Sequence, residues 1–178
     1  PVALQPVVTQ RNALLRDLRE RGGDLGQLVF TDRRLVEHGA YLVSRRGEAI
    51  GALDRLAHLV HSDLTDGVER LHLRYQPSVE GLTEGDVAAV GEAVHSQLAV
   101  LRHREVAAGM TLVGPHRDEV RFMIDDVDTG VYGSRGQQRT AALALKLAEV
   151  DLMRQETGER PVLLLDDVLS ELDPHRRR

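Results

Sequence analysis

The sequence has no cysteine and no tryptophan, and its aromatic residues are limited to two Phe and three Tyr in 178 positions. The lack of cysteine excludes a disulfide framework and thiolate metal sites, and it suits the reducing cytoplasm in which we expect the protein to lie. The scarcity of aromatic side chains disfavours a base-stacking nucleic-acid platform of the RRM or OB type. No apolar run reaches the length of a membrane span, so we expect no membrane partner.

A basic excess is also missing, since the formal net charge is −5. Phosphate binding is electrostatic, so any contact with DNA has to come from a local patch rather than from the chain as a whole. The start at Pro1 without Met and the abrupt end at Arg178 indicate a fragment of something longer.

Lysine is nearly absent, and this decides whether the chain can hold a nucleotide phosphate by itself. A phosphate-binding loop needs the sequence Gly-Lys-Ser/Thr. Lys146, the only lysine, lies between Leu145 and Leu147 inside an apolar helical stretch, where we expect it to be buried. The loop is therefore absent, and we expect the isolated chain not to bind ATP appreciably.

The first third of the chain has apolar residues at helical spacing. They predict one helix over about 7–21, ended by Gly22-Gly23, and a second helix that runs to about 63 from a cap at Thr31 or Asp32. We expect the two helices to pack antiparallel as an arm. Glycine weakens a helix by about 1 kcal/mol relative to Ala. We therefore also expect a bend or break near Gly39, Gly47 and Gly51.

The rest of the chain alternates between short strands and longer helices. Strands are predicted at 71–75, 110–113, 120–124 and 162–165, helices from Thr83 or Asp86 to about 104 and from 137 to 156, and a hairpin-like connection at 125–130. The last helix is apolar nearly all round, which predicts burial on most of its sides. The run at 162–165 has the continuous apolar character of a central parallel strand.

Two carboxylates, Asp166 and Asp167, directly follow that last strand. Ligands of open α/β sheets bind beyond the carboxyl ends of the strands. A carboxylate there can hold Mg²⁺ through water, and its neighbour can orient or activate a hydrolytic water. The alternative is that the pair only caps the following helix or turn.

Ser134 and Gly136 open the apolar helix. A hydroxyl, a glycine amide and a helix N-terminus together form an anion site, because the amides point outward and the helix dipole favours phosphate. Glycine also allows a close backbone approach that a side chain would block. The alternative is that Ser134 serves only as an N-cap.

Three runs of residues carry a resemblance to a known family. They are Gly133-Ser134-Arg135-Gly136-Gln137-Gln138-Arg139-Thr140, Leu143-Ala144-Leu145-Lys146-Leu147-Ala148-Glu149 and Leu164-Leu165-Asp166-Asp167-Val168-Leu169-Ser170-Glu171-Leu172-Asp173. Together they resemble the signature, Walker B and D-loop elements of the RecF family, bacterial recombination mediators related to the SMC and Rad50 heads. Looser similarity covers 10–15 and 112–118. Generic ABC heads have Gly-Gly in the signature and Glu after the Walker B Asp, so Arg135 and Asp167 favour RecF over its relatives.

The resemblance implies an α/β fold, the C-terminal part of an ABC ATPase (P-loop NTPase) head with an inserted helical arm lobe. Residues 1–108 would form the mostly helical arm lobe, with the short strand near 71–75, and residues 109–178 the C-terminal half of the head. The phosphate-binding loop would then lie N-terminal to Pro1 in the parent protein, and the switch histidine beyond Arg178.

The resemblance also implies roles for individual residues, in a site that exists only in a dimer. Arg135 could add positive charge near the phosphates, or it could be a solvated surface charge. Ser134, Arg135, Gly136 and Gln137 would contact the γ-phosphate of ATP bound to the opposite subunit, Asp166 would hold Mg²⁺, Asp167 would occupy the catalytic base position, and Asp173 would reach across the interface.

His116 and Arg117 follow a Gly-Pro turn and are candidates for a phosphate contact, to nucleotide or to DNA. The alternative is that the two side chains are a set of hydrogen-bond donors at a strand edge.

The function implied is that of part of an ATP-dependent DNA-binding protein of recombinational repair and replication. Such a protein would form an ATP-dependent homodimer on single-stranded or gapped duplex DNA, aid recombinase loading and the SOS response, and act with other recombination mediators. One alternative is an ATPase-independent interaction module whose arm, residues 1–66, binds a protein partner. Another is a different SMC-like or Rad50-like head.

Asp167→Asn in the full-length protein is expected to abolish ATP hydrolysis and to leave ATP-driven dimerisation intact, because the side chain would act on the hydrolytic water. Even the natural Asp is shorter than the Glu of generic heads and holds that water less well, so we expect slow turnover. Phosphate release and sedimentation in the presence of ATP measure the two properties. Loss of dimerisation in this variant would contradict the role assigned to Asp167.

Overall fold

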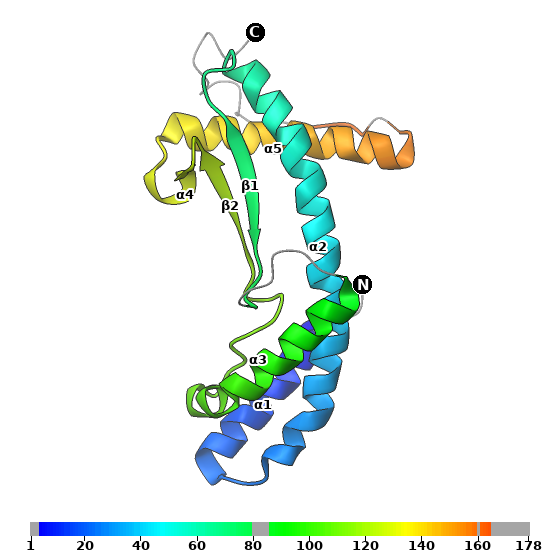
Figure 1. Cartoon of the computed structure of the whole chain (residues 1–178), viewed down its shortest axis with the longest axis vertical. Coiled ribbons are helices and arrows are strands. Elements are labelled where there is room, and N and C mark those ends of the chain that lie inside the picture. Colours follow the sequence, from blue (N-terminus) through cyan, green and yellow to red (C-terminus); the bar gives the residue numbers. More distant parts are fainter. Residues whose placement is uncertain (1–3, 80–85, 160, 165–178) are drawn as a thin grey trace. The chain divides into compact units, whose positions relative to one another are not determined.

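The computed structural model describes residues 4–79, 86–159 and 161–164. The described chain divides by its contacts into two compact units, the first made of 1–47 and 76–119 and the second of 48–75 and 120–178. The division at 108/109 expected from the sequence stays a prediction. No helix among these residues is long and apolar enough to span a bilayer. The elements are α1 (Leu4–Arg21), η1 (Leu25–Leu28), α2 (Val29–Leu64), β1 (Leu71–Gln76), α3 (Val87–Ala108), β2 (Glu119–Ile124), β3 (Val127–Asp128), α4 (Thr129–Tyr132) and α5 (Arg135–Thr157) (Figure 1).

The first helix is confirmed, and it ends where the glycine pair predicts, with Gly22 at a φ of +69°. Asp24 then caps the short η1 by accepting from the amide of Gly26 at 2.8 Å. Helix α2 follows at once and begins at Val29, so the cap expected at Thr31 or Asp32 is wrong. Those two side chains face the interior instead, because both are buried.

Of the bend or break expected in α2, the break is absent, since the helix runs without interruption from Val29 to Leu64. A tertiary contact accounts for one of its glycines. A Cβ on Gly39 would lie 3.3 Å from Cδ of Pro115, so the missing side chain lets the proline loop approach the helix. At Gly51 the same atom would meet nothing within 4 Å, so the helix tolerates this glycine without needing it.

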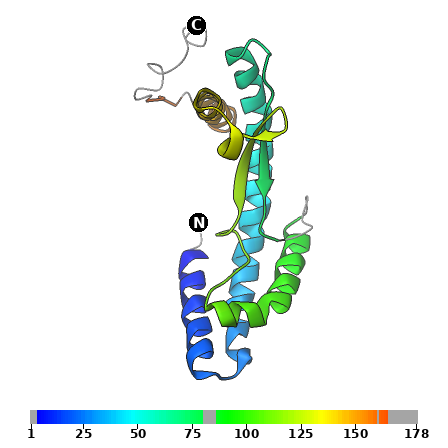
Figure 2. The same ribbon diagram turned by 90° about the vertical axis from the view of Figure 1, so that its left-hand side faces the viewer.

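In the first unit, α1 and the beginning of α2 run antiparallel as predicted (Figure 2), and α3 packs against α1. Helix α3 starts after Asp86, whose carboxylate accepts from the amide of Ala89, and it ends at Gly109 with a φ of +66°. One apolar cluster of this unit consists of Leu15, Leu18 and Leu28, with Leu14, Leu25 and Val106 packed against it.

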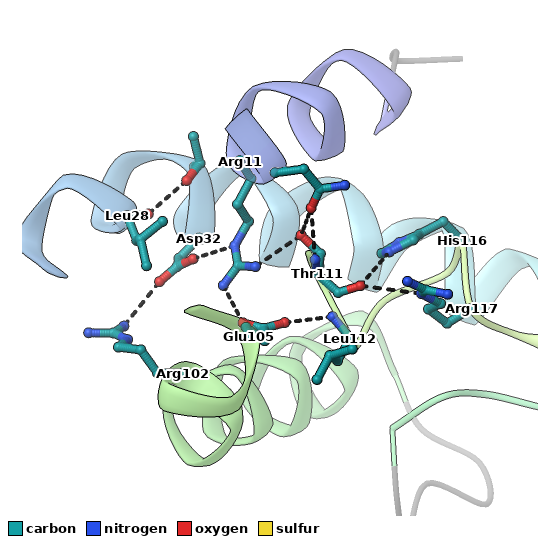
Figure 3. Close-up of polar contacts among 11 residues, drawn as sticks. Arg11, Leu28, Asp32, Arg102, Glu105, Thr111, Leu112, His116 and Arg117 are labelled. Carbon is teal, nitrogen blue, oxygen red and sulfur yellow. Dashed lines mark hydrogen bonds and ion pairs between the residues drawn. The ribbon is translucent and has the colours of Figure 1, made fainter. Parts of the chain in front are cut away.

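A buried cluster of charged groups ties these helices together (Figure 3). The side chain of Arg11 is 0% exposed. Its Nε donates to Asp32 Oδ1 at 2.8 Å and its Nη2 to Glu105 Oε2 at 2.6 Å. Arg102 donates to the second oxygen of Asp32 at 3.0 Å, so the cluster balances two arginines against two carboxylates. Each buried charge therefore has an opposite charge at hydrogen-bond distance, which is the condition for tolerating it in an interior.

The same cluster explains why the strand expected at 110–113 is absent. The amide of Thr111 donates to Asn12 Oδ1 at 2.7 Å, and the amide of Leu112 donates to Glu105 Oε1 at 2.8 Å. Two side chains thus accept the backbone hydrogen bonds that a neighbouring strand would accept in a sheet. The turn at Gly114-Pro115 is confirmed by the bond from Arg117 N to Gly114 O, 2.8 Å long.

The second unit contains a three-stranded sheet in the order β1-β2-β3. Strands β1 and β2 confirm the predictions at 71–75 and 120–124. The predicted hairpin joins β2 to β3, with Ile124 opposite Val127 and the two turn residues, Asp125 and Asp126, at positive φ. The outer edge of β1 is covered by α2 side chains: Asp54 Oδ1 accepts from Leu73 N at 2.6 Å, and His58 Nδ1 lies 3.1 Å from Leu71 O.

Helix α5 packs one face onto this sheet, and the expectation that it is buried on most sides is wrong for the described chain. The buried residues Ala141, Ala144 and Ala148 recur at helical spacing, and they join the core formed by Ala57, Leu71, Leu73 and Ile124. The opposite face has no described element to cover it. Lys146 lies there, 56% exposed and paired with Glu149 at 2.8 Å, so its expected burial is also wrong.

The last predicted strand does not form in its described part, residues 162–164. Val162 and Leu164 are 86% and 90% exposed. A central parallel strand needs hydrogen-bonded neighbours on both sides, and the sheet of the described residues places none beside it. The remaining residue of that strand, Leu165, lies outside the described residues.

Arg11→Ala is expected to lower the free energy of unfolding by about 3–5 kcal/mol, because it leaves the carboxylate of Glu105 buried without its partner. Denaturant unfolding followed by circular dichroism measures the change. The control is Arg21→Ala, since the Arg21 side chain is 80% exposed and pairs with Asp17, one helical turn away. Equal effects of the two substitutions would contradict the role given to the buried cluster.

Candidate functional site

The N-terminal turn of α5 is built by a reciprocal pair of side chains. Ser134 Oγ accepts from the amide of Gln137 at 3.2 Å, and Gln137 Oε1 accepts from the amide of Ser134 at 3.0 Å. This is a capping box, so the N-cap role considered for Ser134 is real. Because the hydroxyl oxygen acts here as an acceptor, its own hydrogen is still available to donate to a ligand.

The same turn presents backbone donors to solvent. The amide of Gln137 donates to the hydroxyl oxygen of Ser134, and the amide of Gln138 donates to its carbonyl. Within the described part of the chain, the amides of Arg135 and Gly136 have no acceptor, and both residues are exposed. Unpaired amides at a helix N-terminus carry the positive end of the helix dipole and attract anions.

The two glycines of this segment differ sharply in the space around them. A Cβ on Gly133 would lie 2.6 Å from the carbonyl oxygen of Thr129, which no side chain tolerates. A Cβ on Gly136 would meet only the hydroxyl oxygen of Ser134, at an ordinary 3.8 Å. The fold therefore needs glycine at Gly133 but not at Gly136.

Helix α4 holds this segment in place from the other side. Thr129 Oγ1 donates to the carbonyl of Phe122 on β2 at 2.7 Å, and Gln138 Nε2 donates back to the carbonyl of Thr129 at 2.9 Å. The amide of Gly133 donates to the same carbonyl at 3.1 Å. The exposed turn is consequently fixed to the sheet by hydrogen bonds on both sides of Gly133.

One partner of the site was missed by the sequence analysis. Gln137 Nε2 donates to Glu69 Oε1 at 3.1 Å, across 68 positions of the chain. Glu69 precedes β1 and belongs to no recognisable motif. Its only sequence signal was its position just before an alternating strand.

The other predicted site residues are placed as follows. The exposed Arg135 has no ion pair among the described residues, so neither of its two interpretations is decided. No group of three His, Asp or Glu side chains in the described part of the chain is arranged to hold a metal ion. Asp166, Asp167 and Asp173 lie outside the described residues, and their roles stay predictions.

His116 and Arg117 lie in the first unit and converge on one carbonyl. His116 Nε2 is 3.4 Å from the oxygen of Thr111, and Arg117 Nε donates to the same atom at 3.3 Å (Figure 3). Burial lowers the pKa of His116 below its ordinary value, and the charge of Arg117 acts in the same direction. The donor-set interpretation thus describes their contacts, although the segment forms a loop rather than a strand edge.

Comparison with known proteins first defines the class. A solved structure described as "the recombination mediator protein RecF-ATPrS in RecFOR pathway" matches with a TM-score of 0.88 and 34% identity, over 97% of this chain and 46% of that one. A second, described as RecF-ATP, gives a TM-score of 0.87. The fold is that of part of an ABC-type ATPase head, as predicted.

The sequence comparisons then define the family. Proteins named "DNA replication and repair protein RecF" match 97% of the chain, at 47% identity in Roseiflexus castenholzii and 41% in Bacillus cytotoxicus. No family model matches. The chain belongs to the RecF family, and it spans about half the length of these relatives, 45% and 46% respectively. The resemblance seen in the sequence is thereby confirmed.

Gly133→Ala is expected to destabilise the second unit by about 1–3 kcal/mol, the usual cost of forcing an atom into packed space. The added methyl would push against the backbone of α4, which is held to β2. Gly136→Ala is the matched control, and it should leave the melting temperature unchanged or slightly raised. A melting temperature that falls equally in both variants would contradict the steric distinction between the two glycines.

Proposed function

We propose that the chain is part of an ATP-dependent DNA-repair protein, in which the N-terminal turn of α5 binds the γ-phosphate of ATP held by a second copy. The observation that carries the proposal is Gly136. It is exposed, its amide has no acceptor within the described chain, and the fold has room for a side chain there. Gly136 differs from other open glycines because its unpaired amide lies in the first turn of a helix, where the missing side chain lets an anion approach the backbone closely.

The chemistry of the turn fits a phosphate. Two amides and the hydroxyl of Ser134 offer donors to an anion, and the dipole of α5 adds to their attraction. Arg135, exposed beside them, would supply a full positive charge to the phosphoryl oxygens. The capping box keeps these groups in one arrangement before the anion arrives, so little ordering is required on binding.

The resemblance to the RecF family supports a proposal for the remaining parts of the ATP site. Asp166 would hold Mg²⁺, Asp167 would take the catalytic base position and Asp173 would reach across to the other copy. The phosphate-binding loop, for which the only lysine is unsuited at its position on α5, would come from another part of the full-length protein. ATP and Mg²⁺ would therefore be bound only between two such proteins.

The wider role follows from the relatives, which are named for DNA replication and repair. We propose that the full-length protein lies in the cytoplasm and dimerises with ATP on single-stranded or gapped duplex DNA. There it would aid recombinase loading and the SOS response together with other recombination mediators. Of the two candidates for a DNA contact, His116 and Arg117, the exposed Arg117 is better placed to reach a phosphate.

Gly136→Ala in the full-length protein is expected to abolish ATP-driven dimerisation without loss of stability, because its methyl group would occupy the space of the phosphate. Sedimentation with Mg²⁺ and ATP measures dimer formation, and thermal unfolding measures stability. Gly51→Ala is the control: it also adds a methyl to a helix in open space, and it should raise stability by about 0.5–1 kcal/mol and leave dimerisation unchanged. Normal dimerisation of the Gly136 variant would refute the proposed site.

A further inference from the structure

The side chain of Gln137 is held at both ends of its amide. Its carbonyl oxygen accepts from the amide of Ser134 at 3.0 Å, and its nitrogen donates to the carboxylate of Glu69 at 3.1 Å. A glutamine amide presents an acceptor on one side and donors on the other. The carboxylate can only accept, so it forces the nitrogen toward itself and the oxygen toward Ser134.

This orientation decides whether the capping box can form. With the amide reversed, an NH₂ group would face the backbone N–H of Ser134, and two donors would oppose each other. The reciprocal bond would be lost and the turn would loosen. Glu69 thus fixes the amide of Gln137, and through it the start of α5.

Glu69 is itself held on a rigid turn between α2 and β1. The turn is closed by bonds from Gly67 N to Ser62 O at 2.8 Å and from Val68 N to Thr65 O at 3.0 Å. On the far side of Glu69, Asp125 N donates to the carbonyl of Arg70 at 3.1 Å and so ties the beginning of β1 to the hairpin.

The second carboxylate oxygen of Glu69 faces inward. It lies 3.8 Å from Nε2 of His61, whose side chain is 0% exposed, while the side chain of Glu69 is 16% exposed. The carboxylate is therefore mostly buried, between Gln137 and His61, rather than open to solvent. In this position the carboxylate can hold the side chain of Gln137 without repelling a phosphate at the solvent side of the turn.

We propose that Glu69 is a positioning residue for the phosphate-binding turn of α5. By orienting Gln137 it keeps Ser134 and the unpaired amides of Arg135 and Gly136 arranged for the nucleotide of a second copy. This role rests on the proposed function, since it concerns the same site. It connects the end of α2 and the start of β1 to the ATP-dependent interface.

Glu69→Ala in the full-length protein should raise the ATP concentration for half-maximal dimerisation roughly tenfold, as expected for loss of a hydrogen bond to a charged group. Glu69→Gln should restore a value near that of the unchanged protein, because its carbonyl oxygen can still accept from Gln137. Sedimentation across a series of ATP concentrations with Mg²⁺ gives these values.

Thr65→Val is the matched control for damage to the turn alone. It removes the bonds from Thr65 Oγ1 to the carbonyls of His61, at 2.8 Å, and Glu69, at 3.5 Å. The side-chain contact between Glu69 and Gln137 keeps both of its partner groups. This variant should be less stable, and its ATP concentration for half-maximal dimerisation should stay unchanged. An equal shift in Thr65→Val and Glu69→Ala would overturn the positioning role, because the turn's stability alone would then account for both.

A second measurement separates this inference from the proposed function. Hydrogen exchange of the Gln137 side-chain amide, followed by NMR on the full-length protein without nucleotide, should be slow in the unchanged protein and fast in Glu69→Ala. Unaltered exchange would overturn the inference directly. Failure of the unchanged full-length protein to dimerise at any ATP concentration would instead refute the proposed function, and the functional role of Glu69 with it.

Discussion

The packing of the helices in the first unit depends on one buried guanidinium group. Arg11 joins α1 to α2 through Asp32, to α3 through Glu105, and to the following loop through Thr111. A charge without water requires partners on every side, and the planar fork of arginine supplies bonds in several fixed directions at once. Lysine, with its compact charge, could not hold three elements in this geometry. Arg11 and Thr111 are thus brought together although they lie about a hundred positions apart in the sequence.

Periodicity predicted most helices and strands, and the errors have tertiary causes. The strand expected at 110–113 had the right apolar run, but the donors of Thr111 and Leu112 are captured by Asn12 and Glu105. The expected break in α2 relied on glycine propensity alone. Helix propensity takes no account of tertiary packing. Gly39 packs closely against Pro115, which lies far away in the sequence. Local patterns therefore predicted the elements well, and failed where a distant side chain replaced a backbone partner.

The site was predicted in outline for similar reasons. Ser134 and Gly136 directly precede an apolar helical stretch, and this local pattern indicates a helix N-terminus. The sequence alone could therefore locate the turn. Nothing local distinguishes Gly133 from Gly136, yet one is confined by a carbonyl and the other is open. Glu69 could not be found at all, since its relation to Gln137 exists only after α5 has packed on the sheet. The burial expected around Lys146 failed because it requires neighbours that the described residues do not contain.

The cover on the outer edge of β1 has a consequence for the behaviour of the protein at high concentration. An uncovered edge strand offers a ladder of free donors and acceptors to any other extended chain, and sheets commonly join in this way into aggregates. Side chains of α2 contact two backbone groups of this edge: Asp54 accepts from Leu73 N, and His58 lies beside Leu71 O. These two groups are therefore less available to pair with a strand of another molecule. Helix α2 thus protects the edge of the sheet against unwanted self-association.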